Sequence, residues 1–297
     1  MNQSKQRQRQ LIINGDDFGV SSRVNQAIIQ AHEQGILTST SLMVTGEAFE
    51  EAVTLAKAYP NLAVGLHLVL ACGRSVLPAN QIPHLVDAQG NFSDQPEKTG
   101  LYYYLSAAAR REIPLELRAQ LEKFRRTGLT LSHVDGHVHI HLQPVVLRHL
   151  VDLADEFNIR FIRLPLEDLA ATLKADRSHL FTKLLLSIVY AGLRHHGKSV
   201  IRSARASSHT LHFVDRVYGL LHSGQMTEDY LLRLIPHIHS NLVEIYSHPA
   251  VAGDPAHESD CSGEAERDAL ISDRVHALIQ EQGFELTNYS QLGAIAR

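Results

Sequence analysis

The stretch that decides the fold is Leu11–Gln34, LIINGDDFGVSSRVNQAIIQAHEQ, in which a short apolar run leads through a polar turn into a helical pattern. Residues 11–13 have the apolar, β-branched character of a buried strand. Residues 21–34 carry apolar side chains at helical spacing, with Ser21 or Ser22 available as the N-cap. A strand followed at once by a helix is the unit from which parallel α/β sheets are built.

The same alternation continues along the chain and predicts a single-domain α/β fold, a distorted (β/α) barrel, with an open doubly wound sheet as the second choice. We expect a disordered tail at 1–10 and one catalytic domain over 11–297. An irregular excursion at about 71–112 is expected to build a pocket wall, and an apolar and basic insertion is expected at about 178–205. Further strands are predicted at 37–44, 63–70, 129–134, 159–164, 241–246 and 284–287, and further helices at 47–58, 115–126, 144–157 and 264–282.

Composition narrows the class of protein. The chain has 297 residues, 44% hydrophobic and 20% charged, which is ordinary globular usage. A net charge of -4 gives no general attraction to nucleic acid, and two cysteines are too few for a disulfide framework. The apolar run 184–193 is far shorter than the roughly 20 residues that cross a bilayer. We therefore expect a cytoplasmic protein, with peripheral contact at the inner membrane surface left open for this segment.

Two adjacent carboxylates, Asp16 and Asp17, follow the first predicted strand in the motif NGDDFG, residues 14–19. Active sites of α/β barrels collect at the carboxyl ends of strands. Neighbouring side chains on extended backbone point in opposite directions, so one carboxylate can bind a metal ion while the other has a different role. A simple strand-to-helix turn explains the pair equally well, because Asp and Gly favour turns and Asp caps helices.

His67 interrupts an apolar strand in the sequence GLHL, residues 65–68. A lone histidine in such a strand is more often a hydrogen-bonded core residue than a ligand. His67 alone therefore favours a structural role.

The segment HVDGHVHIH, residues 133–141, is the strongest indication of chemistry. We expect Gly136 to end the extended backbone, so that one or two histidines reach any one ion and the others support them. A solvated histidine-rich edge is the alternative, but such an edge has no need of alternating valines and a carboxylate. Imidazole and carboxylate suit Zn²⁺ and other divalent ions, and three protein ligands leave room for water and substrate. If the segment stayed extended, one face would carry His133, Asp135, His137, His139 and His141.

A further histidine, His248, stands at the end of a late predicted strand in EIYSHP, residues 244–249. It shares its parity along the strand with Glu244 and Tyr246. Histidine exchanges a proton near neutral pH, which makes His248 a candidate general acid. A structural histidine that anchors a strand end before Pro249 fits the spacing equally well.

Taken in order, NGDDFG, GLHLVL, HVDGHVHIH and EIYSHP resemble the motifs of the YdjC-like carbohydrate deacetylases, which include chitooligosaccharide deacetylases. The similarity runs through most of residues 11–290. Within this family the chain looks most like the hopanoid-biosynthesis-associated branch, which is linked to removal of an N-acetyl group from a glucosamine carried on a bacteriohopane polyol. The resemblance implies a distorted barrel of the polysaccharide-deacetylase-like type.

The resemblance also implies the roles of single residues. Asp17, His67 and His137 would bind a divalent metal ion, with Zn²⁺ or Mg²⁺ expected first. Asp16 would be the base that activates water, and His248 would protonate the leaving amine. The implied substrate is a small N-acetylated sugar or a glycolipid, which would be converted to acetate and a free amino sugar.

Three positions depart from the family pattern or extend it. Many relatives have NADDFG and HHHVH where this chain has Gly15 and Val138, and neither residue is an implied ligand. Cys72, just beyond the strand of His67, stands where a substrate contact would be natural, and the sequence leaves open whether it makes one.

Two other function classes stay open. A metal-dependent phosphoesterase or amidohydrolase can share the His-x-His pattern, and a non-catalytic module can bind a metal ion or a sugar without turnover. The late position of His-x-His, after an Asp-Asp pair, favours the deacetylase.

Overall fold

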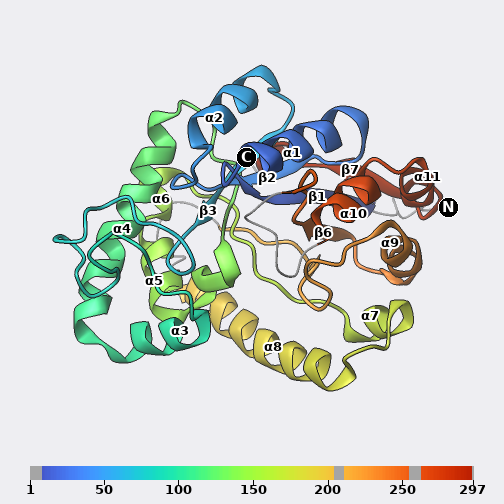
Figure 1. Cartoon of the computed structure of the whole chain (residues 1–297). Coiled ribbons are helices and arrows are strands. Elements are labelled where there is room, and N and C mark those ends of the chain that lie inside the picture. Colours follow the sequence, from blue (N-terminus) through green and yellow to red (C-terminus); the bar gives the residue numbers. More distant parts are fainter. Residues whose placement is uncertain (1–8, 204–210, 254–261, 296–297) are drawn as a thin grey trace.

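The longest strand, β1 (Arg9–Phe18), lies at the centre of a seven-stranded sheet in the computed structural model (Figure 1). Residues 9–203, 211–253 and 262–295 are the described part of the chain. β1 pairs in parallel with β2, β6 and β7, and the strand order is β4-β3-β2-β1-β6-β5. The other strands are β2 (Ser39–Leu42), β3 (Ala63–Leu68), β4 (Val134–Gly136), β5 (Arg216–Tyr218), β6 (Leu242–Ser247) and β7 (Phe284–Thr287).

Beyond β4 the sheet continues as single bridges rather than as a regular strand. The apolar pattern predicted a strand at 159–164. This segment pairs with its neighbours on both sides only through single bridges, so it does not form a regular strand. The bridges extend the curl of the sheet from β4 toward β5, and the predicted distorted barrel is confirmed. They join Val134 to Ile162, Phe161 to His212 and Leu166 to Val217.

Helices surround the curled sheet (Figure 1). The first helix begins as predicted, because the hydroxyl of Ser21 accepts a hydrogen bond from the amide of Val24 at 3.1 Å. The helices are α1 (Ser22–Gln34), α2 (Phe49–Ala58), α3 (Pro96–Leu105), α4 (Ala107–Arg126), α5 (Pro144–Asp152), α6 (Ala154–Phe157), α7 (Leu169–Ala175), α8 (Leu180–Ser203), α9 (Glu228–Leu234), α10 (Gly263–Leu270), α11 (Asp273–Glu281) and α12 (Tyr289–Ile295). Short 3₁₀ segments are η1 (His137–Leu142) and η3 (Ile235–His237).

The N-terminal tail ends earlier than expected. Residues 1–8 lie outside the described residues, but Arg9 and Gln10, which we had assigned to the tail, already belong to β1. Arg9 is held by hydrogen bonds to the carbonyl groups of Gln282, at 2.7 Å, and Ile238, and its guanidinium lies over the ring of Phe284. These contacts to distant segments order the first residues of the strand.

The excursion expected over 71–112 is irregular only to residue 95. Pro96 begins α3, and the hydroxyl of Ser106 caps α4 by accepting from the amide of Ala109 at 3.2 Å. The amphipathic pattern predicted a helix only over 115–126, and a proline normally interrupts a helix. In this chain Pro114 lies inside α4.

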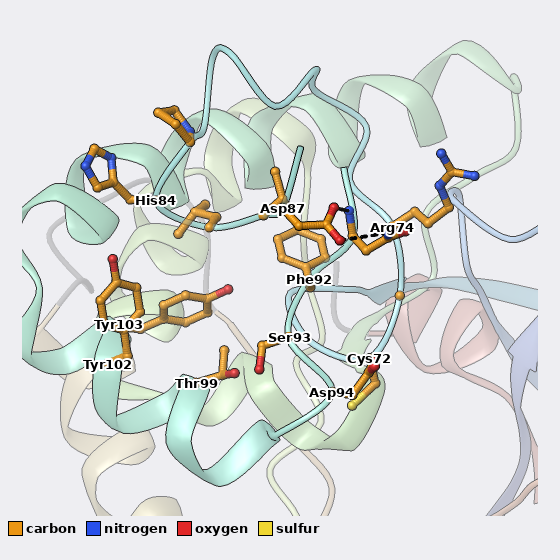
Figure 2. Close-up of a pocket in the computed structure, with 15 residues that line it drawn as sticks. Cys72, Arg74, His84, Asp87, Phe92, Ser93, Asp94, Thr99, Tyr102 and Tyr103 are labelled. Atoms are coloured by element: carbon orange, nitrogen blue, oxygen red, sulfur yellow. Dashed lines mark hydrogen bonds between the residues drawn. The ribbon is translucent and has the colours of Figure 1, made fainter. Parts of the chain in front are cut away.

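Cys72 lines a cavity of about 770 Å³ that the irregular segment forms together with α3 (Figure 2). This cavity is not the one that holds the predicted catalytic residues. This placement does not favour a contact between Cys72 and the substrate. β3 ends at Leu68, and the chain has turned away from the sheet by Cys72, whose backbone is left-handed.

The side chains of β1 alternate between an apolar and a polar environment. Leu11 and Ile13 belong to the main hydrophobic core, together with residues of the surrounding helices. On the opposite face of the strand, Asn14 donates a hydrogen bond to the hydroxyl of Ser41, and Asp16 binds Arg163. The curl of the sheet therefore encloses a polar network at the level of the candidate site.

Candidate active site

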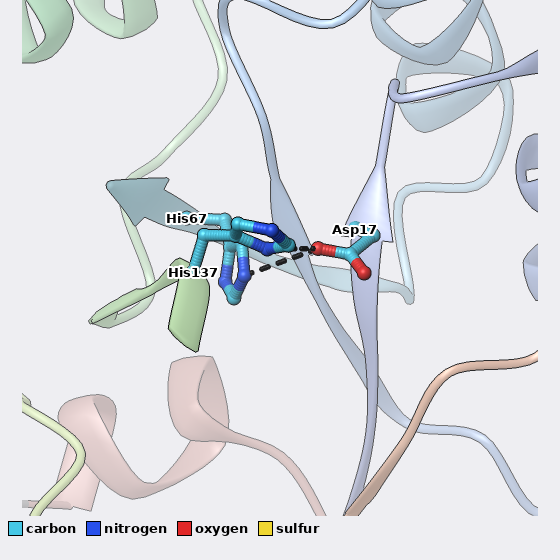
Figure 3. A group of neighbouring side chains, drawn as sticks. All are labelled: Asp17, His67 and His137. Atoms are coloured by element: carbon cyan, nitrogen blue, oxygen red, sulfur yellow. Dashed lines mark hydrogen bonds and ion pairs between the residues drawn. The ribbon is translucent and has the colours of Figure 1, made fainter. Parts of the chain in front are cut away.

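The predicted ligands meet at the carboxyl ends of three strands of the sheet. Asp17 is the second-last residue of β1, His67 the second-last of β3, and His137 follows directly after β4. Parallel pairing brings these strand ends to one edge of the sheet. Figure 3 shows the three side chains facing one another, although they lie 50 and 70 positions apart in the sequence.

The spacing of the three side chains fits a divalent metal ion. Oδ1 of Asp17 lies 3.2 Å from Nε2 of His67 and 3.0 Å from Nδ1 of His137. Donor atoms around a tetrahedral ion with bonds of roughly 2.1 Å lie about 3.4 Å apart. Two imidazole nitrogens and one carboxylate oxygen also form a donor set that several divalent ions accept. These residues can hold such an ion with positions left for water and substrate.

The backbone conformation of Asp17 directs its side chain differently from that of Asp16. Its φ angle is +65°, in the left-handed region that Asp tolerates better than most residues. Burial alone would raise the pKa of the Asp17 carboxyl group, but His137 and His67 outweigh it and hold the pKa well below its usual range. The side chain of Asp17 is therefore an ionised carboxylate that can bind a cation.

His67 is oriented by a second carboxylate. Nδ1 of His67 lies 2.8 Å from Oδ1 of Asp135, which leaves Nε2 facing Asp17. Burial would lower the pKa of His67, but the hydrogen bonds and charges of Asp135 and Asp17 raise it to about 10. A carboxylate behind a histidine is the usual arrangement around metal sites, where it fixes the tautomer of the ligand.

Asp16 lies beside the three candidate ligands and binds a buried arginine. Nη1 and Nη2 of Arg163 lie 2.7 and 2.8 Å from the two carboxylate oxygens of Asp16, and Nδ2 of Asn14 donates to Oδ1 at 2.8 Å. An oxygen of Asp16 nevertheless lies within 4.8 Å of a ring nitrogen of His67. Asp16 is thus fixed beside the candidate metal site without being one of its three ligands.

Arg163 is the residue that sequence reasoning missed. It is fully buried and also contacts Asp135 at 2.8 Å and Glu244 at 2.7 Å. Burial would lower the pKa of the Arg163 guanidinium, but these carboxylates raise it well above its ordinary value. The signal was a second arginine, besides Arg160, within the otherwise apolar segment 159–164, a place where an unpaired charge is too costly to bury.

A second group of possible ligands, Asp16, His67 and Asp135, is less suited to a metal ion. The guanidinium of Arg163 already lies against the carboxylates of both Asp16 and Asp135 and neutralises them. An added cation would meet that positive charge, so the group that contains Asp17 and His137 is the better candidate.

The remaining histidines of the mid-chain motif take separate positions. Extended backbone ends at Gly136, as expected, although β4 overlaps the predicted strand 129–134 only at Val134. The segment η1 follows with left-handed backbone at Val138 and His139. Nε2 of His139 lies 2.9 Å from the hydroxyl of Tyr246, and His141 binds the carbonyl group of Arg163 through Nε2 at 2.8 Å. One face of five aligned side chains therefore does not form. His133 stacks on Tyr289 instead.

A cavity of about 890 Å³ opens over the candidate metal site. Asp16, Asp17, His67 and His137 line one end of it, and His248 lines the same cavity from the end of β6. Nδ1 of His248 is buried and, among the described residues, has no hydrogen-bond partner. The fold thus brings all five predicted residues to one cavity, with His248 outside the three-ligand cluster.

The rest of this cavity is mostly apolar, with Glu97, Gln143 and Ser223 among its polar lining residues. Its walls come from α3, from η1 with the start of α5, and from one side of α8. Leu101 and Tyr104 contribute from α3, and Val189 and Leu193 contribute from α8. The cavity thus combines a polar end at the candidate metal site with a mostly apolar outer part.

Carbohydrate deacetylases are among the proteins that this chain resembles in sequence. The chain is 32% identical over 287 residues to a carbohydrate deacetylase of Geobacillus stearothermophilus, covering 95% of this chain and 98% of that protein. A carbohydrate deacetylase of Brevibacillus brevis strain 47 is 45% identical over 149 residues, a match that spans 50% of this chain and 57% of that protein.

A solved structure shares the fold over nearly the whole chain. It is an Enterococcus faecalis V583 protein whose suggested role is cellobiose-phosphate cleavage, with a TM-score of 0.73 and 26% identity, and the match covers 96% of this chain and 99% of that chain. Residues 10–281 also match the sequence profile described as YdjC-like protein. The chain therefore belongs to the YdjC-like family.

Proposed function

We propose that this protein is a metal-dependent N-deacetylase that hydrolyses the acetamide group of an N-acetylglucosamine-type sugar. The observation that supports this most is the cluster of Asp17, His67 and His137 at one end of the large cavity, with Asp16 beside it. The names of the relatives support a sugar substrate. The products would be acetate and a free amino sugar.

In this proposal Asp17, His67 and His137 hold a divalent ion. Such an ion lowers the pKa of water toward about 7 and stabilises the oxyanion that forms from an attacked carbonyl group. Asp16 accepts the proton of the attacking water. The two hydrogen bonds from Arg163 keep the carboxylate of Asp16 in one orientation. Asp135 keeps Nε2 of His67 directed at the ion.

His248 is the proposed acid. It lines the cavity, and its buried Nδ1 atom is free of partners among the described residues, so a substrate atom can take that place. Protonation of the departing nitrogen is required because an amide releases an amine and not an amide anion. The amide of His248 donates to Glu266 at 2.5 Å, which fixes the backbone that carries the imidazole.

The finer substrate assignment is a sugar carried on a hopanoid lipid. It rests on the resemblance of the motifs to the hopanoid-associated branch, and the apolar outer part of the cavity supports it. A sugar at the polar end would leave an attached apolar group among the side chains of α3 and α8.

A substrate panel tests the proposal. Acetate release is measured from N-acetylglucosamine, from its oligomers and from a hopanoid-linked conjugate, and phosphate release is measured from an aryl phosphate. We expect acetate and no phosphate. Phosphate release without acetate would favour a phosphoesterase, and binding of metal and sugar without any turnover would favour a non-catalytic module.

A further inference from the structure

Large apolar side chains that are exposed in this chain are concentrated on two helices. Among the described residues, twelve such side chains are exposed, and ten of them belong to α3 or α8. Monomeric soluble proteins rarely expose contiguous apolar surface on this scale without a binding partner. On α3 they are Leu101, Tyr102, Tyr104 and Leu105.

On α8 the exposed side chains form two rows along one side of the helix. The rows repeat every four residues, which places their members above one another on the helix surface. Phe181 is 78% exposed and Ile188 is 63% exposed, so the neighbouring elements do not cover this side. The rows are Leu180, Leu184 and Ile188, and Phe181, Leu185 and Val189. We call this side, together with the exposed residues of α3, the α3/α8 face.

The two halves of the α3/α8 face belong to one surface. Leu101 and Tyr104 of α3 and Val189 of α8 are exposed and also line the catalytic cavity. Both helices contact η1, the segment that begins with the ligand candidate His137 (Figure 1). The apolar face therefore reaches the edge of the cavity at these three side chains.

The charges of α8 are all positive. The helix contains no Asp or Glu, and Lys183, its one charge before Arg194, is buried and paired with Asp176. Exposed Lys174 and Arg177 precede the apolar rows. On α3 the single acid is matched by a neighbouring lysine. An apolar face flanked by cations complements an anionic lipid surface, even though the whole chain has a net charge of -4.

A lipid bilayer explains this exposed apolar surface and its flanking cations better than a second copy of the chain does. No helix of the described ranges is long and apolar enough to pass through a membrane, so only a contact in the plane of the surface is compatible with α8. A second copy of the chain, packed symmetrically, would bring two faces together that are both flanked by positive charge.

We propose that the α3/α8 face docks on an anionic lipid bilayer, with the mouth of the catalytic cavity directed at the lipid. Exposed side chains such as Phe181 and Ile188 enter the interfacial region, and the flanking cations contact lipid phosphates. The docking itself does not depend on the chemistry of the site. Its consequence, access to a lipid-anchored sugar, rests on the proposed function.

Vesicle binding by the full chain tests the docking. Sedimentation is measured with vesicles of phosphatidylcholine alone and with vesicles of equal parts phosphatidylcholine and phosphatidylglycerol. The test variant is Leu185→Ser combined with Phe181→Ser, because neither residue lines the cavity. Leu115→Ser is the matched control, since Leu115 on α4 is 51% exposed against 52% for Leu185.

We expect the wild type and Leu115→Ser to bind the anionic vesicles more tightly than the neutral ones. The double variant should lose roughly tenfold or more in partitioning, because two large apolar side chains no longer enter the interface. Its turnover of a water-soluble acetamido sugar should be unchanged. Vesicle binding that is absent, or equal in all three proteins, would overturn the docking while leaving the deacetylase proposal standing. A dimer in sedimentation velocity that the double variant dissociates would also overturn it, by assigning the face to a second copy.

Discussion

Nδ1 of His67 lies 2.8 Å from Oδ1 of Asp135, the residue directly opposite it in the register of β3 and β4. One hydrogen bond between neighbouring strands therefore decides which nitrogen of His67 faces the candidate metal site. The pairing of β3 with β4 thus also sets the orientation of the candidate ligand His67.

Asp135→Asn tests this link between the sheet and the site. We expect metal affinity to fall about 10- to 100-fold, because the amide no longer fixes the tautomer and basicity of His67. Affinity is measured by competition with a chelating dye, and circular dichroism checks that the variant is folded. Asp152→Asn is the control, since it removes the carboxylate of an exposed Asp-His pair, with His149, on α5. Equal affinities in the two variants would contradict the orienting role.

Metal binding should depend on pH through His67. Its pKa of about 10 means that the metal-free protein holds a proton on this imidazole, which a metal ion must displace. Apparent affinity should therefore rise about tenfold per pH unit across the neutral range. Calorimetry in buffers of different ionisation enthalpy measures the proton released. An affinity that is independent of pH, with no proton release, would contradict the raised pKa of His67 in the metal-free protein.

The same shift predicts the stability of the metal-free protein. A folded-state pKa above the ordinary value of 6.5 contributes stability that is complete below that value and is lost as the pH rises toward about 10. Thermal unfolding of chelated protein across this range measures it. Metal-free protein that gained stability toward pH 10 would contradict the assignment.

Arg163→Met should cost about 3–5 kcal/mol of unfolding free energy, because it leaves three carboxylates buried without their cation. Arg118→Met is the matched control. Arg118 also forms a two-pronged contact, with Glu156, but both side chains are nearly half exposed, so its loss should cost at most about 1 kcal/mol. Denaturant titration measures both, and similar losses would show that Arg163 is not the centre of the interior network.

Gly65→Ala should destabilise the protein by about 1–3 kcal/mol through overpacking. An added Cβ would lie 2.4 Å from the ring of His133, which is fully buried and stacked on Tyr289 with ring centroids 4.1 Å apart. Gly192→Ala on α8 meets nothing within 4 Å and should stabilise by about 0.5–1 kcal/mol. Melting temperatures measure the two variants, and shifts of the same sign would contradict this packing.

Sequence patterns could predict much of the fold because each regular element carries its own local signal. The apolar run of β1, the cap of α1 at Ser21 and the closing strand β7 all appear where the patterns placed them. Strand pairings are not local, so the segment 159–164 could not be distinguished from a regular strand. Helix α4 begins before Pro114 for a similar reason, since contacts with the surrounding structure override the tendency of proline to interrupt a helix.

The sequence also pointed to Asp16, Asp17, His67, His137 and His248, which the fold brings to one cavity. Their spacing in the chain could suggest ligands but not the network behind them. Arg163 stayed unnoticed because its partners come from three other strands. The left-handed turn at Val138 and His139 was equally out of reach, since β-branched Val rarely adopts such backbone.

The most direct test of the central claim is acetate release from an N-acetylglucosamine conjugate by metal-loaded, chelated and reloaded protein, with Asp16→Asn and His137→Ala measured alongside. Our account predicts release by the loaded and reloaded wild type only, with Asp16→Asn still binding the ion and His137→Ala binding it weakly. Full activity in the chelated protein or in Asp16→Asn would contradict the account.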